Sequence, residues 1–338
     1  MDTLLKPVSK TVTAGGRCIY SFPVRAFPEL VANIYLVSDG QTRWLVDTGS
    51  GRAESNADLV AGLAAVGETF GEPITLAELD GILITHGHID HFGGLPFVRQ
   101  HSSAPIGVHP LDRRVLSHYE ERVLVAARQL ETFLKRAGVG RSQSANLMAM
   151  YLFAKNIYHS TAVQFTLEEG RYGPADILVH HVPGHCPGQV CLQVDDILLT
   201  ADHVLSRTSP HQAPESITNN TGLGHYLASL AKIRRVEGVS LALGGHEAPI
   251  VQLQSRIGAI EALHAQRLEQ VLEICAEPRS TAAISRALFG RAHGYHVLLA
   301  LEEAGAHVEY LYQLGELVAA NLDEIESEAE PVVRYRRV

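Results

Sequence analysis

Cysteine, membrane-length apolar runs and a secretory leader are scarce or missing in this sequence of 338 residues. The four cysteines form no Cys-x-x-Cys pair and show no spacing typical of a disulfide framework, so we expect reduced thiols in a cytoplasmic protein. No apolar run is long enough to span a bilayer, and residues 1–16 contain no long apolar segment of the kind a secretory signal requires. These absences predict a soluble, intracellular chain with no membrane partner.

Positive charge is also in short supply. Lys and Arg total 28 against 37 Asp and Glu, which gives a net charge of -9. Such a chain does not attract phosphate backbones as a whole. Hydrophobic residues make up 46% and charged residues 19%, so the chain can bury a sizeable core and is not disordered. The length fits one large domain plus a small one, and the 18 histidines are the compositional oddity.

The expected elements run in the order strands, helices, strands, helix, strand, followed by a helical tail. The apolar run at 81–85 is bounded by polar residues and predicts a strand buried on both faces. Helical spacing in the tail predicts several helices, including one at 309–321. We expect a large domain at 1–254 with a helical insertion at about 112–160, and a small C-terminal domain at 255–338.

Three histidines and an aspartate fall within six positions directly after the predicted strand. They are His86, His88, Asp90 and His91 in the segment Thr-His-Gly-His-Ile-Asp-His. The carboxyl end of a buried strand is where α/β proteins place their sites. Imidazole and carboxylate together suit zinc, iron or manganese. Solvent-exposed residues without a function would not explain so many potential ligands in six positions, so the segment predicts a metal site.

Three later segments add candidate ligands of the same kind. His185 lies in a Pro-Gly-His turn, Asp202 ends an apolar strand, and His246 follows Gly-Gly after another. Because each follows a predicted strand, all three side chains could converge on one rim with the first group.

These motifs, in this order, resemble the metallo-β-lactamase-fold hydrolase superfamily over roughly residues 17–254, in its glyoxalase II-like and thioesterase-like branch. The resemblance implies an α/β fold, an αβ/βα sandwich of two mixed sheets with helices outside. It is specific for the fold and the metal site and does not identify a substrate.

The resemblance also implies a ligand set for two divalent metal ions. It assigns the first ion to His86, His88 and His185, the second to Asp90, His91 and His246, and Asp202 to both. Asp47, in Val-Asp-Thr-Gly, resembles the family's buried aspartate that orients the ligands. Zn²⁺ is expected first, with iron or manganese as alternatives. A metal-bridging hydroxide would cleave an ester-like bond, best a thioester or a lactone, and Asp90 would orient this nucleophile.

The helical insertion and one further histidine are candidates for substrate contact. Residues 112–160 hold eight Lys or Arg against four acids, a net charge of +4. Arg113, Arg114 and Arg122 could bind an anionic small-molecule substrate, although a solvated basic helix face explains the same pattern. His211 follows the strand that ends at Asp202 and could donate a proton, the alternative being a surface histidine.

The tail resembles the winged-helix extension of some superfamily members. Residues 256–338 carry eight Arg and no Lys against 13 acids, a net charge of -5, which argues against nucleic-acid binding. We expect the tail to pack on the main domain or to form a homodimer. The competing functions are a metal-dependent ribonuclease, an iron-dependent oxygen or sulfur redox enzyme, and a binding module without turnover.

Overall fold

The computed structural model describes residues 7–155 and 157–338, so residues 1–6 of the expected large domain and residue 156 of the insertion lie outside it. The chain divides into two compact units. Unit 1 consists of the residues up to 119 with 159–210 and 230–256, and unit 2 of residues 120–158, 211–229 and 257–338. Most of the expected insertion therefore groups with the C-terminal region and not with the rest of the expected 1–254 domain.

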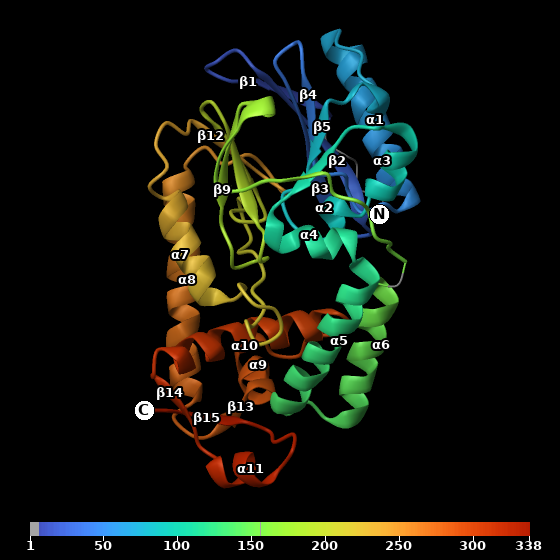
Figure 1. The fold of residues 1–338 in the computed structure, drawn as a ribbon. Helices are drawn as coiled ribbons and strands as arrows, with labels where there is room; N and C mark the ends of the chain where they lie inside the picture. The colour runs from blue at the N-terminus through green and yellow to red at the C-terminus, as the bar shows by residue number, and fades with distance from the viewer. Residues whose placement is uncertain (1–6, 156) are drawn as a thin grey trace. The chain divides into compact units, whose positions relative to one another are not determined.

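A seven-stranded sheet forms the first layer of unit 1 (Figure 1). Its strands, in spatial order, are β1 (Ser9–Val12), β2 (Cys18–Phe27), β3 (Leu30–Ser38), β4 (Arg43–Val46), β5 (Gly81–Leu83), β6 (Ile106–Val108) and β7 (Phe165–Thr166). The pairs from β1 to β4 are antiparallel, and those from β4 to β7 are parallel. The predicted strand at 81–85 is β5, buried along its whole length in the middle of the parallel part.

A five-stranded sheet forms the second layer. Its strands, in spatial order, are β12 (Leu241–Gly244), β11 (Ile197–Ala201), β10 (Val190–Val194), β9 (Ile177–His181) and β8 (Gly170–Tyr172). Only β11 and β12 run parallel. One apolar core lies between the sheets, with Val37 and Leu83 from the first packed in one cluster with Val179, Leu192 and Leu199 from the second. The expected sandwich of two mixed sheets is confirmed.

The helices of unit 1 follow strands of the first sheet. They are α1 (Ala53–Phe70), α2 (Ile89–Phe92), α3 (Leu95–His101) and α4 (Pro110–Ser117), with short 3-10 turns η1 (Leu76–Glu78) and η2 (Gly173–Ala175). Helix α1 packs on β2, where the buried Asp58 carboxylate accepts hydrogen bonds from the Arg25 backbone and guanidinium at 2.7–2.9 Å. This contact fixes α1 on the sheet, and it involves none of the histidine-motif residues.

Unit 2 contains α5 (Tyr119–Arg136), α6 (Arg141–Lys155) and most of the C-terminal elements, while α7 (Leu223–Ile233) and α8 (Leu253–Ile274) cross the boundary between units. The apolar stripe of α5, including Leu130 and Leu134, packs with Leu298 and Leu301 of α10 (His296–Gln313). The insertion thus buries its apolar face against the C-terminal helices.

The prediction of a helix at 309–321 is wrong. Helix α10 continues to Gln313, and the chain then forms β14 (Leu317–Ala319). Gly315, with a φ of 77°, adopts the left-handed conformation that ends the helix. Strand β14 pairs with β15 (Arg334–Arg337), which also pairs with β13 (Arg279–Ser280), so tertiary pairing overrides helical spacing. The remaining helices here are α9 (Thr281–Phe289) and α11 (Leu322–Ser327).

Two expected absences can be compared with the structure. All four cysteines are free thiols, three of them buried. Among the described helices, none combines the length and the apolar character that crossing a membrane requires.

Candidate metal centre

The first candidate ligands lie on the loop that leaves β5. His86 and His88 precede α2, and His88 is the N-cap residue of that helix. Asp90 and His91 lie in its single turn. The helix begins immediately after His88, so four potential ligands leave the end of one buried strand within six residues.

The other three candidates also follow strands. His185 lies four residues beyond β9, Asp202 directly follows β11, and His246 lies two residues beyond β12. Since β11 and β12 are parallel neighbours, their carboxyl ends meet at one edge of the second sheet. The sequence motifs therefore converge because of the strand order, as expected.

Three histidines form the first group of potential ligands. One ring nitrogen from each of His86, His88 and His185 lies within 4.8 Å of the others. His86 Nε2 and His88 Nδ1 are 3.1 Å apart, and the His88 and His185 rings meet edge to face with centroids 4.5 Å apart. Three imidazoles facing one point offer the nitrogen donors of a transition-metal site.

Asp90, His91, Asp202 and His246 form the second group. His246 Nε2 lies 3.3 Å from Asp90 Oδ2 and 3.3 Å from Asp202 Oδ2. His91 Nε2 lies 3.4 Å from Asp202 Oδ1. Asp202 Oδ2 is also 3.7 Å from Nε2 of His185 in the first group, so this carboxylate faces both groups.

Unpaired buried atoms show that these residues fit a cation. His91 Nε2 and Asp202 Oδ1 are buried, and neither has a hydrogen-bond partner among the residues that the structure describes. Leaving a buried polar atom unpaired costs about 1–3 kcal/mol. Gly245 packs closely against this carboxylate, because a Cβ there would lie 2.3 Å from Asp202 Oδ1. A divalent ion would satisfy both atoms with ligands it prefers.

The electrostatics of the second group favour positive charge. Burial alone would lower the pKa of His246, but Asp202 and Asp90 raise it to about 10. Burial opposes the charged form of His91 as well, and Asp202 again outweighs it, so that pKa is raised. The pKa values of both carboxyls are lowered despite burial, because His246 and His91 stabilise their charge. Burial lowers the pKa of His86 and so favours its neutral form. The carboxylates that raise the pKa values of His91 and His246 would equally stabilise a metal cation in place of those protons.

Asp47 contacts His91 of the second group. It follows β4 with a φ of 64°, and its Oδ2 accepts a hydrogen bond from His91 Nδ1 at 2.8 Å. Thr85 donates to the same carboxylate through its backbone N–H and its hydroxyl, both at 2.8 Å. His246 is held in the same way, because its Nδ1 donates a hydrogen bond to the Val31 carbonyl oxygen at 2.7 Å. Both rings therefore present Nε2 to the centre.

Comparison with known protein families identifies the chain. The family model of the metallo-beta-lactamase superfamily matches residues 28–246, which contain every candidate ligand. The chain belongs to this superfamily. It is therefore a hydrolase of a family that uses divalent metals, and its histidine and aspartate groups fit such a site. A second family model, for the metallo-beta-lactamase-like C-terminal domain, matches residues 268–338.

This metallo-beta-lactamase-superfamily hydrolase is similar to two proteins that are named thioesterases. It is 24% identical over 67% of its length to an atrochrysone carboxyl ACP thioesterase of Aspergillus fumigatus, and 28% identical over 64% to an acyl-coenzyme A thioesterase of Bos taurus, 72% of which is covered. The chain spans only 53–59% of the fungal relatives that it matches. A metallo-beta-lactamase family protein of Thermus thermophilus superposes with a TM-score of 0.77 at 25% identity, covering 95% of this chain and 98% of that one.

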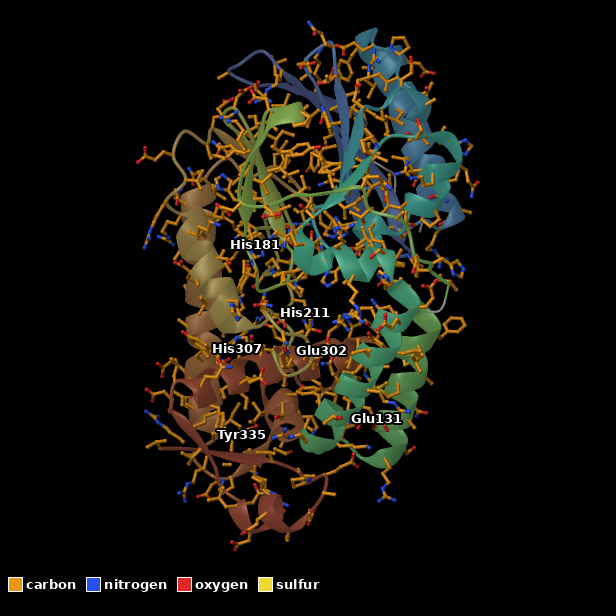
Figure 2. The ribbon with its side chains drawn as sticks, in the orientation of Figure 1. Glu131, His181, His211, Glu302, His307 and Tyr335 are labelled. Carbon is orange, nitrogen blue, oxygen red and sulfur yellow. The ribbon has the colours of Figure 1, made fainter. Side chains whose placement is uncertain are left out.

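His211, the candidate proton donor of this superfamily member, belongs to unit 2. Its Nε2 lies 3.0 Å from Glu302 Oε2, and its Nδ1 lies 3.5 Å from Glu303 Oε2 (Figure 2). Burial would lower its pKa, but these two glutamates raise it to about 9. His211 is therefore protonated at neutral pH, and both of its ring nitrogens face carboxylates.

The three candidate arginines do not share a unit. Arg113 and Arg114 are exposed on α4 of unit 1. Arg122 lies on α5 within unit 2, is half-buried, and donates from Nη2 to Thr218 Oγ1 at 3.0 Å. The first two are exposed, whereas Arg122 contacts Thr218 within its own unit.

Sequence reasoning missed two buried or partly buried carboxylates that support the loops of the centre. Glu247, next to His246, accepts hydrogen bonds from the Ser206 hydroxyl and the Thr208 hydroxyl at 3.1 and 2.8 Å, which holds the loop after Asp202. Asp112 is fully buried and contacts both loops that carry the first group. Neither acid belongs to a motif. In the sequence, Asp112 counted only as one of four acids in a basic segment.

A third histidine group, in unit 2, differs from the metal centre because its members satisfy one another. His307 Nδ1 donates to the Glu303 backbone carbonyl at 2.7 Å, so its Nε2 can accept from His264 Nδ1 at 3.1 Å. The Glu303 carboxylate accepts from Arg267 at 2.7 Å and from the Gln212 N–H at 2.8 Å. This network is stable with neutral imidazoles and needs no ion.

The stability of unit 2 should therefore fall in acid. Burial lowers the pKa of His264 to about 4, from an ordinary value of 6.5. As the pH falls below 6.5, the unfolded chain takes up a proton before the folded one, so stability that is complete above this pH is lost toward pH 4 by up to about 3 kcal/mol. Hydrogen-exchange protection of α8 and α10 between pH 7 and 4.5 measures the loss. His264→Asn keeps a donor without titrating, and an equally steep loss in that variant would contradict the assignment.

Proposed function

We propose that the chain is a dinuclear metal hydrolase that cleaves acyl thioesters. His86, His88 and His185 would hold one divalent ion, and Asp90, His91 and His246 the other, with Asp202 shared by both. The observation that carries this proposal is the position of Asp202 Oδ2, 3.7 Å from His185 Nε2 and 3.3 Å from His246 Nε2. A carboxylate oxygen with a histidine nitrogen of each group in reach supports a bridging role.

The chain's own residues would prepare the reaction around the ions. Bound divalent ions would supply Lewis acidity for the substrate carbonyl and a water of lowered pKa. Asp47 keeps His91 protonated at Nδ1, so its Nε2 remains a ligand. Asp90, whose pKa is lowered, is ionised and can accept a hydrogen bond that orients the attacking water. The role of His211 as a proton donor stays a prediction, because its ring nitrogens face Glu302 and Glu303 within unit 2.

Two observations support a thioester over a lactone or an RNA. Two relatives are named thioesterases, one for an acyl carrier protein substrate and one for acyl-coenzyme A. Such substrates join an acyl group to an anionic carrier, which suits exposed arginines in a chain of net charge -9. A nucleic acid would meet the same overall repulsion over a much longer contact, so we expect no ribonuclease activity. We expect Zn²⁺ in both positions, and elemental analysis for zinc against iron separates hydrolysis from the redox alternative.

A substrate comparison tests the function. We expect faster hydrolysis of anionic acyl thioesters than of neutral esters, lactones or RNA, with an advantage that shrinks as salt rises, because exposed charges are screened over about 10 Å at 0.1 M. Replacing Arg113 and Arg114 together by Gln should raise KM for the anionic thioester about 2- to 10-fold and spare the neutral ester. Arg122→Gln is measured separately because that residue belongs to unit 2.

The matched control replaces Arg234 and Arg235, a pair of arginines elsewhere in unit 1, by Gln. It changes the net charge by the same amount and should leave KM nearly unchanged. Equal effects of the two double variants, or of salt on both substrates, would show that Arg113 and Arg114 form only a solvated face. Hydrolysis of none of these substrates by the metal-loaded chain would refute the proposed thioesterase activity.

A further inference from the structure

The Asp112 carboxylate joins the two loops that present the first histidine group. It lies in the first turn of α4 and is fully buried. Its Oδ2 accepts from the Gly87 N–H at 2.7 Å and from the Cys186 thiol at 3.2 Å. Its Oδ1 accepts from the Gly188 N–H at 2.9 Å. One side chain therefore contacts segments about 100 residues apart in sequence, 87 and 186–188.

Both segments carry proposed ligands. Gly87 lies between His86 and His88, and Gly188 lies three residues after His185. The approach at Gly188 is very close, because a Cβ there would lie 2.6 Å from Asp112 Cγ. A longer side chain at 188 would force the loop away from the carboxylate. Asp112 thus sets the distance between the peptide of one ligand loop and the turn of the other.

The chemistry of the three contacts requires an ionised carboxylate. Two backbone N–H groups and a thiol are all donors, and an ionised carboxylate is an acceptor only. A buried carboxylate is costly unless it is hydrogen-bonded, and here both oxygens are engaged. An asparagine of the same shape would keep one acceptor but would turn an N–H₂ group toward a donor. Charge and not shape is therefore what this position supplies.

Further contacts hold the same turn from its other side. His181, labelled in Figure 2, donates from Nε2 to the Pro187 carbonyl oxygen at 2.8 Å. The His181 ring stacks on His109, the N-cap residue of α4, with centroids 3.7 Å apart and planes 11° from parallel. The turn at 186–188 is therefore fixed to α4 both through Asp112 and through this stacked pair.

The arrangement complements that of Asp47. Asp47 accepts from Thr85 and His91 and so orients the second group, whereas the three donors to Asp112 all flank the first. We propose that Asp112 is the positioning residue of the first metal: its carboxylate holds the His86–His88 loop and the His185 turn at the spacing that ligation needs. This role rests on the proposed function only in that the three histidines bind an ion.

Metal binding by the Asp112→Asn variant tests the role independently of turnover. The full chain is freed of metal and titrated with Zn²⁺ in competition with a chelator, which resolves two affinities. We expect the variant to bind one Zn²⁺ about 10- to 100-fold more weakly and the other with an affinity within about threefold of wild type. The larger factor is the loss typically caused by removing a residue that hydrogen-bonds to a metal ligand or its loop. Adding Asp112→Asn to His88→Ala, which removes a ligand of the same ion, should cause little further loss.

Two other variants separate positioning from general stability. Asp58→Asn makes the same chemical change at a buried carboxylate that Arg25 holds, and it should leave both Zn²⁺ affinities unchanged. Cys186→Ala removes only the longest of the three contacts and should weaken the same ion by a smaller factor, which gives a milder variant should Asp112→Asn fold poorly. Amide exchange at Gly87 and Gly188 in the metal-free chain should speed up in Asp112→Asn and not in Asp58→Asn.

The possible failures are distinguishable. If wild type binds two Zn²⁺ ions and Asp112→Asn binds both as tightly, or loses both equally, Asp112 does not position the first metal. The same conclusion follows if Cys186→Ala folds normally and binds the first ion as wild type does while Asp112→Asn is unfolded. If wild type itself binds no divalent ion, the proposed function fails and the role of Asp112 fails with it.

Discussion

The Asp202→Ala variant should lose both metal ions, whereas wild type prepared without chelators should hold close to two per chain. Asp202 has a histidine nitrogen of each group within 3.7 Å, so its removal takes a ligand from both positions. Removing a residue that hydrogen-bonds to a metal ligand lowers metal affinity by about 10- to 100-fold. Loss of a ligand shared by both ions should therefore lower the affinity by more than about 100-fold at each position. Turnover should fall with the doubly occupied fraction.

Elemental analysis and Zn²⁺ titration of the same samples measure this effect. His88→Ala is the informative comparison, because it belongs to the first group alone and should empty mainly one position. Asp196→Ala removes a carboxylate that binds Ser240 and Ala14 in the same unit, and it should keep both ions. An Asp202→Ala chain that loses only one ion would rule out the bridge. A wild type fully active with one ion, and not improved by more, would rule out the dinuclear centre.

Asp90→Asn should reduce kcat by about 100- to 1000-fold while KM changes by no more than about threefold. The aspartate is ionised in the centre, and its proposed task of orienting the attacking water matters only as the transition state forms. Losing such a group typically costs about 3–4 kcal/mol of transition-state stabilisation. Asparagine keeps the size of the side chain and one oxygen, so metal can be restored by saturating Zn²⁺ before the kinetic constants are measured.

The occupancy of the variant decides how the kinetics are interpreted. Asp58→Asn serves as the control for an Asp-to-Asn change at a buried carboxylate outside the centre, and it should retain wild-type kcat. If Asp90→Asn shows near-normal turnover with both positions filled, Asp90 is a ligand without a part in orienting the nucleophile. If full occupancy cannot be reached at any Zn²⁺ concentration, Asp90 acts mainly as a ligand of the second ion.

The centre could be predicted from sequence because its residues follow strands. His86, His185, Asp202 and His246 each come shortly after a run of apolar residues, and such runs have a local signature. Carboxyl ends of neighbouring parallel strands meet at one edge whatever the rest of the chain does. The resemblance of these motifs to a family then supplied the grouping of the ligands, which spacing alone leaves open.

The insertion shows where sequence reasoning was insufficient. Its net charge of +4 and its apolar stripe were both visible, but a stripe does not say what it packs against. In the structure the stripe of α5 packs on α10, so Arg122 belongs to a different unit from Arg113 and Arg114. A single charged patch inferred from a contiguous segment therefore becomes two separate sets of side chains.

What the sequence by itself determined is local: the strands, the ligands that follow them, and Asp47 beside its strand. Tertiary structure alone decided the contacts of Asp112 and the conformation of residues 309–321. Asp112 acquires its three donors from loops that only folding brings together, and residues 317–319 become a strand because β15 offers unpaired backbone groups there. The physical reason is common to both. Hydrogen-bond partners distant in sequence leave no periodicity or spacing in the chain, so the pairing exists only once the fold has formed.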